Sequence, residues 1–221
     1  MEAPLLGDAF CGELPGSARS LSNEFTATYQ GSPPSRILHQ SDNFSFLVDL
    51  SPIVRGHTLI VPHEHELNMA AAVIGFEKEF SRFVRHCAER YREAYGPATI
   101  IEHGSSQVDV AAGSCITHAH WHFLPKIAGL PRTFAADRLP KICDVDFADY
   151  LLPTSAAGGP YILFADEHGA AIYEATDLPL PQYARSLVGR LAGMSPAEWD
   201  WAVVVRKQTF WDTYRDLGGS E

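Results

Sequence analysis

Hydrophobic and polar residues alternate along three short stretches that lie close together in the chain. Residues 35–40 (SRILHQ), 44–50 (FSFLVDL) and 57–62 (HTLIVP) carry the β-branched and aromatic residues that strands favour. The turn residues 41–43 separate the first two stretches. Because strands that are neighbours in sequence usually pair in space, the pattern predicts an antiparallel sheet.

A spacing of three and four residues replaces this alternation between residues 76 and 95. Such a stripe is typical of an amphipathic helix that buries one face, and the Gly96-Pro97 pair ends it. We therefore predict a long helix that covers one face of the sheet. Its apolar positions are Phe76, Phe80, Phe83, Val84, Cys87, Tyr91 and Tyr95.

Two further strands are expected after the helix, at residues 98–104 (ATIIEHG) and 116–124. The resulting order of strands, helix and strands predicts an α+β fold. A break in the pattern, TSAAGGP, follows at residues 154–160. We place a boundary there and assign residues 1–153 to a core domain.

Residues 154–221 have the pattern of a hairpin and helices rather than of a tail. Strand-like stretches flank the turn residues 166–169, and a helix is expected from Pro181 to Gly193. Residues 195–198 (SPAE) have the form of a capping box. We predict that this C-terminal extension packs on the core domain.

Composition limits the classes of partner. The chain has 221 residues, of which 46% are hydrophobic, enough for one large domain or a domain with an appended subdomain. Its 17 Lys and Arg residues stand against 27 Asp and Glu residues, and the net charge of −10 argues against binding a long nucleic acid. A small anionic ligand held in one pocket is compatible with this charge.

The cysteines and the N-terminal residues bear on location. Four widely spaced cysteines in a chain of this size favour a reducing compartment, and we expect a cytoplasmic protein. The first residues, MEAPLLGDAFCGELPG, lack the basic start and apolar run of a signal peptide. Since no apolar run is long enough to span a bilayer, no membrane partner is expected.

Three histidines, His118, His120 and His122, occupy every second position of the stretch CITHAHWHFLP. On a strand their side chains would project from the same face. They could be structural histidines with hydrogen-bond partners, metal ligands, or a nucleophilic imidazole with two supporting neighbours. The pattern alone leaves these interpretations open.

Two motifs resemble those of the histidine triad (HIT) superfamily. The stretch HAHWHFLP, preceded by GSC at residues 113–115, is similar to that family's signature, and DLSPIVRGHTLIVPHEH at residues 49–65 is similar to its upstream signature. The likeness runs from about Phe10 (FCGELPG) to Pro125. The stretch PQYARSLVGRLAGMSPAEWDW at residues 181–201 resembles longer, GalT-like or dinucleotide-phosphorylase-like members.

The resemblance implies a HIT-like antiparallel sheet with a covering helix that binds a nucleoside 5′-phosphate derivative and cleaves it at the α-phosphorus. By this analogy His120 attacks and becomes transiently nucleotidylated, His122 contacts the phosphate or leaving group, and His118 holds the geometry of the loop and ring. No metal or other cofactor is required for this chemistry. The family also implies a homodimer with joined sheets, unless the C-terminal part covers the sheet edge.

The same analogy assigns further substrate contacts. Asp49 matches the acidic residue that binds ribose hydroxyls, Leu47 matches the wall of the base pocket, and His57 matches a histidine near the nucleophile, with a packed strand histidine as its alternative. Ser114 and Cys115 lie beside the expected phosphate, and Cys115 stands where many members have serine.

Other positions depart from the family pattern or lie outside its motifs. Glu102 stands near the position of an asparagine, so it is expected either to serve the leaving group or a substrate hydroxyl, or to face solvent at a strand end. Gln182 and Arg185 are candidates for extended substrate contacts, with polar residues on a helix surface as the alternative. For Trp199 and Trp201 we favour a core role.

A structural zinc site and two other functions also remain candidates. Members with a C-x-x-C motif bind structural zinc, and here Asp8, Cys11, His65 and His118 would form a mixed ligand set. The alternatives to a nucleotidyl hydrolase or transferase are a metal-dependent hydrolase that uses the three histidines as ligands, and a nucleotide-binding module without turnover. The sequence does not distinguish hydrolase, phosphorylase and transferase, or identify the base.

Overall fold

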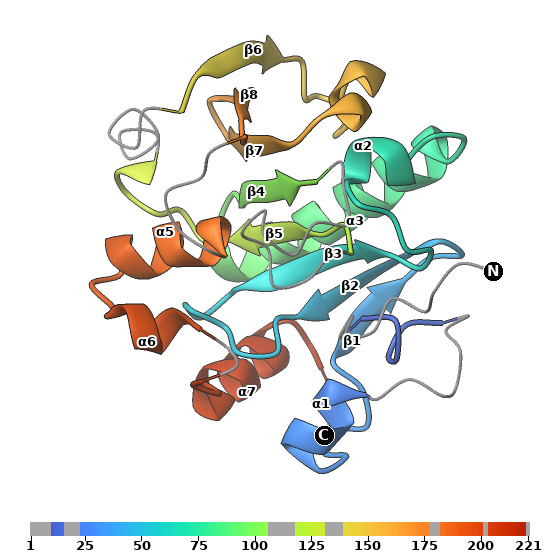
Figure 1. The fold of residues 1–221 in the computed structure, drawn as a ribbon. Coiled ribbons are helices and arrows are strands. Elements are labelled where there is room, and N and C mark those ends of the chain that lie inside the picture. Colours follow the sequence, from blue (N-terminus) through green and yellow to red (C-terminus); the bar gives the residue numbers. More distant parts are fainter. Residues whose placement is uncertain are drawn as a thin grey trace, which may run out of the picture.

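The computed structural model describes residues 10–15, 23–105, 118–130, 139–176, 182–200 and 203–219. Within these ranges, eight strands form one sheet in the order β1-β2-β3-β5-β4-β7-β8-β6, and all neighbouring strands are antiparallel (Figure 1). The strands are β1 (Ile37–Gln40), β2 (Phe44–Val48), β3 (Thr58–Pro62), β4 (Thr99–Gly104), β5 (Trp121–Leu124), β6 (Lys141–Val145), β7 (Tyr161–Asp166) and β8 (Gly169–Glu174).

Helices lie on both faces of the sheet and at its β1 end (Figure 1). They are α1 (Glu24–Tyr29), α2 (Met69–Ala72), α3 (Glu77–Tyr95), the 3₁₀ helix η2 (Thr154–Gly158), α5 (Tyr183–Leu191), α6 (Pro196–Trp199) and α7 (Lys207–Asp216). The predicted α+β fold is therefore confirmed. Among the described residues, no helix is long and apolar enough to cross a membrane.

Helix α3 is the predicted covering helix. Its residues Phe80, Phe83, Val84, Cys87 and Tyr91 are buried, as the spacing predicted. They pack against buried side chains of the sheet in one cluster. Since burying a side chain of this size contributes about 1.5–3 kcal/mol, this contact is a major source of stability. The first residue of the expected stripe, Phe76, is instead the N-cap and is exposed.

The C-terminal hairpin extends the sheet instead of lying on top of it. Strand β7 pairs with β4, with Glu102 opposite Leu163, and β8 pairs with β7. The edge of β4 is thus filled from within the chain, and β1 and β6 form the two ends of the sheet. Strands from both sides of the predicted boundary at residues 153–154 share one sheet.

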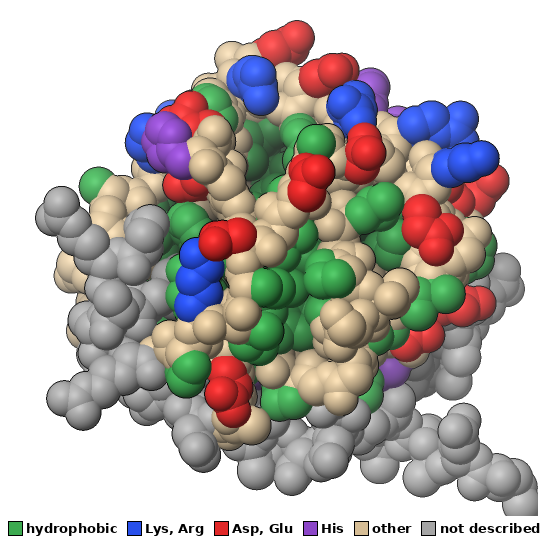
Figure 2. All heavy atoms as spheres, turned by 90° about the horizontal axis from the view of Figure 1, so that it is seen from above, with side chains coloured by type: hydrophobic (Ala, Val, Ile, Leu, Met, Phe, Trp, Pro, Cys, Tyr) green, Lys and Arg blue, Asp and Glu red, His purple; other side chains and the backbone are tan. Residues whose placement is uncertain are grey.

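Helix α5 covers the face of the sheet opposite α3. Its residues Tyr183, Leu187 and Val188 pack in one buried cluster with Ile101 and Ile162 of β4 and β7. The two main clusters therefore lie on opposite sides of a single sheet. On the surface seen from above, Lys and Arg side chains stand beside Asp and Glu side chains, as expected for an acidic chain (Figure 2).

Candidate active site

The three histidines face away from α3, although they do not all lie on a strand. β5 begins at Trp121, so the strand expected from residue 116 is shorter, and His118 and His120 precede it. The alternation of faces nevertheless holds, because Ala119, Trp121 and Phe123 are buried in the cluster beneath α3. The histidines project to the face that α5 covers.

His118 points toward the N-terminal segment at residues 10–15. Its Nε2 donates to the carbonyl oxygen of Pro62 at 2.8 Å, and its Nδ1 lies 3.6 Å from Sγ of Cys11. Sγ of Cys11 is also 3.3 Å from Nδ1 of His65. A buried ion pair between Arg36 and Glu13, 2.7 Å long, holds this segment in place. His118 is therefore a structural member of the triad.

His120 is the partly exposed histidine of the triad, whereas His118 and His122 are buried. Its Nδ1 lies 2.8 Å from the carbonyl oxygen of His118. A carbonyl accepts only, so Nδ1 carries the proton and Nε2 carries the lone pair. The ring of Phe10 packs beside it, with centroids 5.5 Å apart. This is the tautomer that a nucleophilic imidazole requires.

His122 forms a buried pair with His57. Nε2 of His57 lies 2.9 Å from Nδ1 of His122, and Nδ1 of His57 accepts the backbone N–H of Ile53 at 3.3 Å. With Nδ1 as an acceptor, the proton of a neutral His57 ring is on Nε2 and is donated to His122. His122 then carries its own proton on Nε2. The pair thus fixes both tautomers.

Burial keeps both rings uncharged. It lowers the pKa of His57 to about 4, with Asp49 opposing the shift and Arg185 adding to it. Burial, and then the neighbouring rings of His120 and His57, hold the pKa of His122 well below its usual range. Two neutral imidazoles at neutral pH can share one directed hydrogen bond, as the 2.9 Å contact requires.

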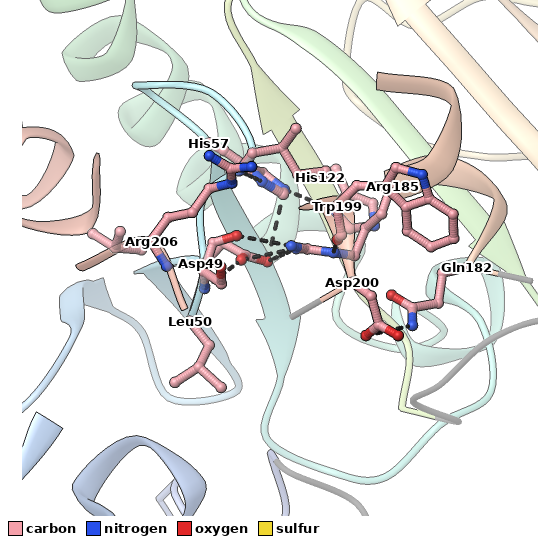
Figure 3. Close-up of polar contacts among 12 residues, drawn as sticks. Asp49, Leu50, His57, His122, Gln182, Arg185, Trp199, Asp200 and Arg206 are labelled. Carbon is pink, nitrogen blue, oxygen red and sulfur yellow. Dashed lines mark hydrogen bonds and ion pairs between the residues drawn. The ribbon is translucent and has the colours of Figure 1, made fainter. Parts of the chain in front are cut away.

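Asp49 is bound by an arginine of the C-terminal extension (Figure 3). Nη1 of Arg185 lies 2.9 Å from both carboxylate oxygens, and the backbone N–H of Ser51 donates to Oδ1 at 2.8 Å. Both side chains are buried. The carboxylate to which the family analogy assigns ribose hydroxyls is therefore in contact with a side chain of α5.

Arg185 is also not the exposed helix residue considered from the sequence. Its Nε donates to the carbonyl of Trp199 at 3.0 Å and its Nη2 to the carbonyl of Ser51 at 2.8 Å. Burial is the largest single influence on Asp49 and favours its neutral form, but Arg185, followed by His57, His122 and Arg36, together outweigh burial and hold the pKa of that carboxyl below its usual range. All three guanidinium nitrogens of Arg185 thus have hydrogen-bond partners within the protein.

The other predicted residues of the extension have structural contacts. Gln182 lies just before α5 with φ of 49°, and its Nε2 donates to Oδ1 of Asp200 at 3.1 Å. Trp199 is buried in the cluster of α5, which confirms the core role. Figure 3 shows both residues beside Arg185. Trp201 lies outside the described residues.

Glu102 faces the opposite side of the sheet from the histidines, so both expectations for it are wrong. It is fully buried, and its oxygens accept from the backbone N–H of Met69, from Nε1 of Trp121 and from the hydroxyl of Tyr161 at 2.6, 2.9 and 2.7 Å. Burial raises its pKa to about 7, against these hydrogen bonds. Glu102 joins α2, β5 and β7 and cannot reach a substrate on the other face.

His103, the next residue, is a member of the site that sequence reasoning missed. Alternation along β4 places it on the face opposite to Glu102. Its Nε2 is buried and has no hydrogen-bond partner among the described residues. Burial, and then His120, lower its pKa to about 4, so the two rings are close enough to interact. The two-residue period of the strand could have identified it.

The remaining predicted positions fall into two groups. Leu47 is fully buried with Phe10, Leu14, Leu59 and Val61, so the expected wall of a base pocket is a closed apolar cluster here. Asp8, Ser114 and Cys115 lie outside the described residues.

Within the described part of the chain, the donors that converge closely enough for a metal ion form two groups. One contains Cys11, His65 and His118, and the other contains Asp49, His57 and His122. Neither group contains the whole triad, because His118 and His122 point to different neighbours. The geometry therefore disfavours a catalytic metal held by the three histidines.

The fold and the site define a class: an antiparallel sheet with a covering helix, in which a central strand and the residues just before it place an ordered set of imidazoles on one face. Residues 30–129, a little under half of the chain, match the family described as "HIT domain".

Relatives with HIT in their names match somewhat less than half of the chain. "Protein hit" of Bacillus subtilis is 25% identical over 105 residues, which cover 46% of this chain and 69% of that protein. An "Uncharacterized HIT-like protein" of Borreliella burgdorferi is 25% identical over 101 residues, covering 42% and 67%. A hypothetical histidine triad nucleotide-binding protein from Sulfolobus tokodaii is 22% identical, covers 47% of this chain and 68% of that one, and has a TM-score of 0.35.

Proposed function

We propose that this protein is a nucleotidyl hydrolase or transferase that cleaves a nucleoside 5′-phosphate derivative at its α-phosphorus, with His120 as the nucleophile. The observation that carries the proposal is the contact between Nδ1 of His120 and the carbonyl of His118, which leaves the lone pair on Nε2 of a partly exposed ring. The match of residues 30–129 to the HIT domain supports a nucleotide as substrate.

The proposed reaction has two steps. Nε2 of His120 attacks the α-phosphorus, a P–N bond forms, and the bond to the leaving group breaks with its electron pair on the leaving group, which takes a proton from solvent. The N–H on Nε2 of His122 donates a hydrogen bond to the phosphate oxygens, where negative charge builds up. Water or another hydroxyl acceptor then attacks phosphorus, the P–N bond breaks with its electron pair returning to Nε2 of His120, and the proton of the acceptor passes to solvent.

Intact-protein mass spectrometry tests this mechanism. The wild type and His120→Ala would be incubated with nucleoside 5′-phosphoramidates, dinucleoside polyphosphates and nucleotide sugars. We expect an adduct of one nucleoside monophosphate, or the released mononucleotide, that His120→Ala abolishes. His168→Ala is a matched control, because His168 is 73% exposed on the β7–β8 hairpin and should leave turnover unchanged. An adduct that persists in His120→Ala would refute the role of His120, and bound nucleotide without turnover would indicate a binding module.

We also propose a structural zinc ion bound by Cys11, His65 and His118, with a fourth ligand from outside the described residues such as Asp8. With Zn–S of about 2.3 Å and Zn–N of about 2.0–2.1 Å, a tetrahedral site places sulfur and nitrogen about 3.5 Å apart. The observed separations of 3.3 and 3.6 Å fit this geometry. The ion would fix the N-terminal segment and His118 without entering the reaction. Metal analysis should find one zinc per chain, lost in Cys11→Ser, while an unchanged zinc content would exclude the site.

The proposed setting is cytoplasmic, with a small nucleotide as partner. Cys87 and Cys143 form no disulfide, which is compatible with a reducing compartment. The homodimer that the family implies stays a prediction. Because β7 occupies the edge of β4, a dimer would need a surface other than that edge.

A further inference from the structure

Arg185 stands at the head of a chain of contacts that ends at the triad. Its Nη1 binds both oxygens of Asp49 at 2.9 Å. Oδ2 of Asp49 lies 3.8 Å from Nε2 of His57, and that same nitrogen lies 2.9 Å from Nδ1 of His122. The rings of His122 and His120 follow, with centroids 4.8 Å apart. Arg185, where this series of contacts begins, belongs to α5 and lies 65 positions after His120 in the sequence.

Two acceptors compete for the single proton on Nε2 of His57. The nitrogen of His122 at 2.9 Å is within hydrogen-bond distance, and the carboxylate of Asp49 at 3.8 Å is not. A carboxylate is the stronger acceptor of the two, so it would take the proton if it could approach. Arg185 prevents this approach, because it holds both oxygens in an ion pair.

The position of Arg185 is itself fixed from three sides. Its Nε and Nη2 donate to the carbonyls of Trp199 and Ser51, so the guanidinium cannot follow Asp49 toward His57. Both oxygens of Asp49 contact Nη1, and Oδ1 also accepts from the backbone of Ser51. Figure 3 shows Arg185 of α5 directing its guanidinium at the carboxylate of Asp49.

We propose that Arg185 is a positioning residue for the histidine site, because it holds Asp49 away from His57. The proton on Nε2 of His57 is then donated to Nδ1 of His122. As a result, the N–H of His122 stays on Nε2, which faces the phosphate. This inference rests on the proposed function. It makes α5 part of the active site without any contact between α5 and the substrate.

The test compares Arg185→Met, the double variant Arg185→Met/Asp49→Asn, and the control Arg55→Met. Arg55 forms a pair with Asp216 at 2.6 Å, which also ties a C-terminal helix to the loop around Asp49 but does not reach the histidines. In Asp49→Asn the uncharged amide would not compete for the His57 proton while its oxygen accepts from Ser51. Each variant is measured by steady-state kinetics, thermal unfolding and ¹⁵N NMR of the histidine rings.

We expect Arg185→Met to lower kcat about 10- to 100-fold, as loss of a supporting residue behind a catalytic group commonly does, with KM nearly unchanged. The ring nitrogen signals of His122 should shift away from the wild-type Nε2–H tautomer. The double variant should recover kcat and the wild-type signals, although it has lost the ion pair. Arg55→Met should match the wild type in both measurements.

Two results would overturn the proposal: wild-type ring signals in Arg185→Met, or a folded double variant that recovers neither kcat nor the tautomer. If Arg185→Met does not fold, the double variant decides the matter, since it contains no uncompensated buried carboxylate. If the wild type turns over no nucleotide, the proposed function fails by itself, and the NMR comparison still shows whether Arg185 sets the tautomer.

Discussion

Replacing Glu102 by glutamine should change how stability depends on pH. The pKa of Glu102 is raised from 4.5 to about 7 in the folded protein, chiefly by burial. A raised pKa means that the fold favours the protonated form, so this residue destabilises the fold progressively as pH rises from 4.5 to about 7. The effect levels off above pH 7. The size of the shift corresponds to about 3 kcal/mol.

The variant Glu102→Gln removes this pH dependence of stability, but the substitution also destabilises the fold in another way. Nε1 of Trp121 and the hydroxyl of Tyr161 both approach Oε2, and an amide NH₂ there would leave the indole N–H without an acceptor. We expect a penalty of about 1–3 kcal/mol at pH 5, where the wild-type side chain is protonated or nearly so. At pH 8 the penalty should shrink by about 3 kcal/mol, and the variant should equal or exceed the wild type in stability.

Urea unfolding of both proteins at pH 5, 6, 7 and 8 measures the difference. Subtracting the two curves isolates Glu102, because the buried histidines titrate alike in both proteins. A difference in the free energy of unfolding that stays constant from pH 5 to 8 would refute the reasoning. It would mean that the three hydrogen bonds to Glu102 compensate for burial and keep the carboxylate ionised throughout.

Three further outcomes are expected. Substrates that lack the ribose 2′-hydroxyl should be turned over with a kcat/KM within about threefold of that of the parent compounds, because Arg185 occupies Asp49. Such a change is smaller than the loss of a typical hydrogen bond would cause, whereas a drop of about tenfold or more would show that Asp49 binds the ribose 2′-hydroxyl. The pKa of His57 falls from 6.5 to about 4 on folding, so His57 should contribute about 3 kcal/mol of stability that is lost as the pH falls from 6.5 to about 4. In urea unfolding, His57→Gln should reduce this loss of stability at acidic pH. Gly104→Ala should lower the free energy of unfolding by about 1–3 kcal/mol, because its Cβ would lie 2.5 Å from the ring of Tyr161. Gly158→Ala is the control, because the space around Gly158 is open. Equal effects of the two substitutions on unfolding would contradict the packing argument.

Local periodicity predicted most of the fold correctly. The period of two along residues 44–50 and 98–104 gave β2 and β4, and the three- and four-residue spacing gave α3. Strand β6 was not expected, because three of its five residues are exposed and it lies at the end of the sheet. A strand with little burial leaves no strong pattern in the sequence.

The candidate site was only partly predictable. The alternation of His118, His120 and His122 correctly indicated one shared face. The pairing of Asp49 with Arg185 joins residues 136 positions apart, and no local pattern reports such a contact. Glu102 was misplaced because its family position was used, although the strand period puts His103 on the histidine face instead.

The pairing of β7 with β4 also has a consequence for biosynthesis. While the chain is being made, residues 99–104 leave the ribosome more than fifty residues before their partner strand, and Arg185 follows later still. Until then, the edge of β4 lacks its β7 partner, and exposed strand edges promote aggregation. The nascent chain therefore passes through a stage in which this strand edge is open, and the contact of Arg185 with Asp49 can form only when synthesis has passed α5.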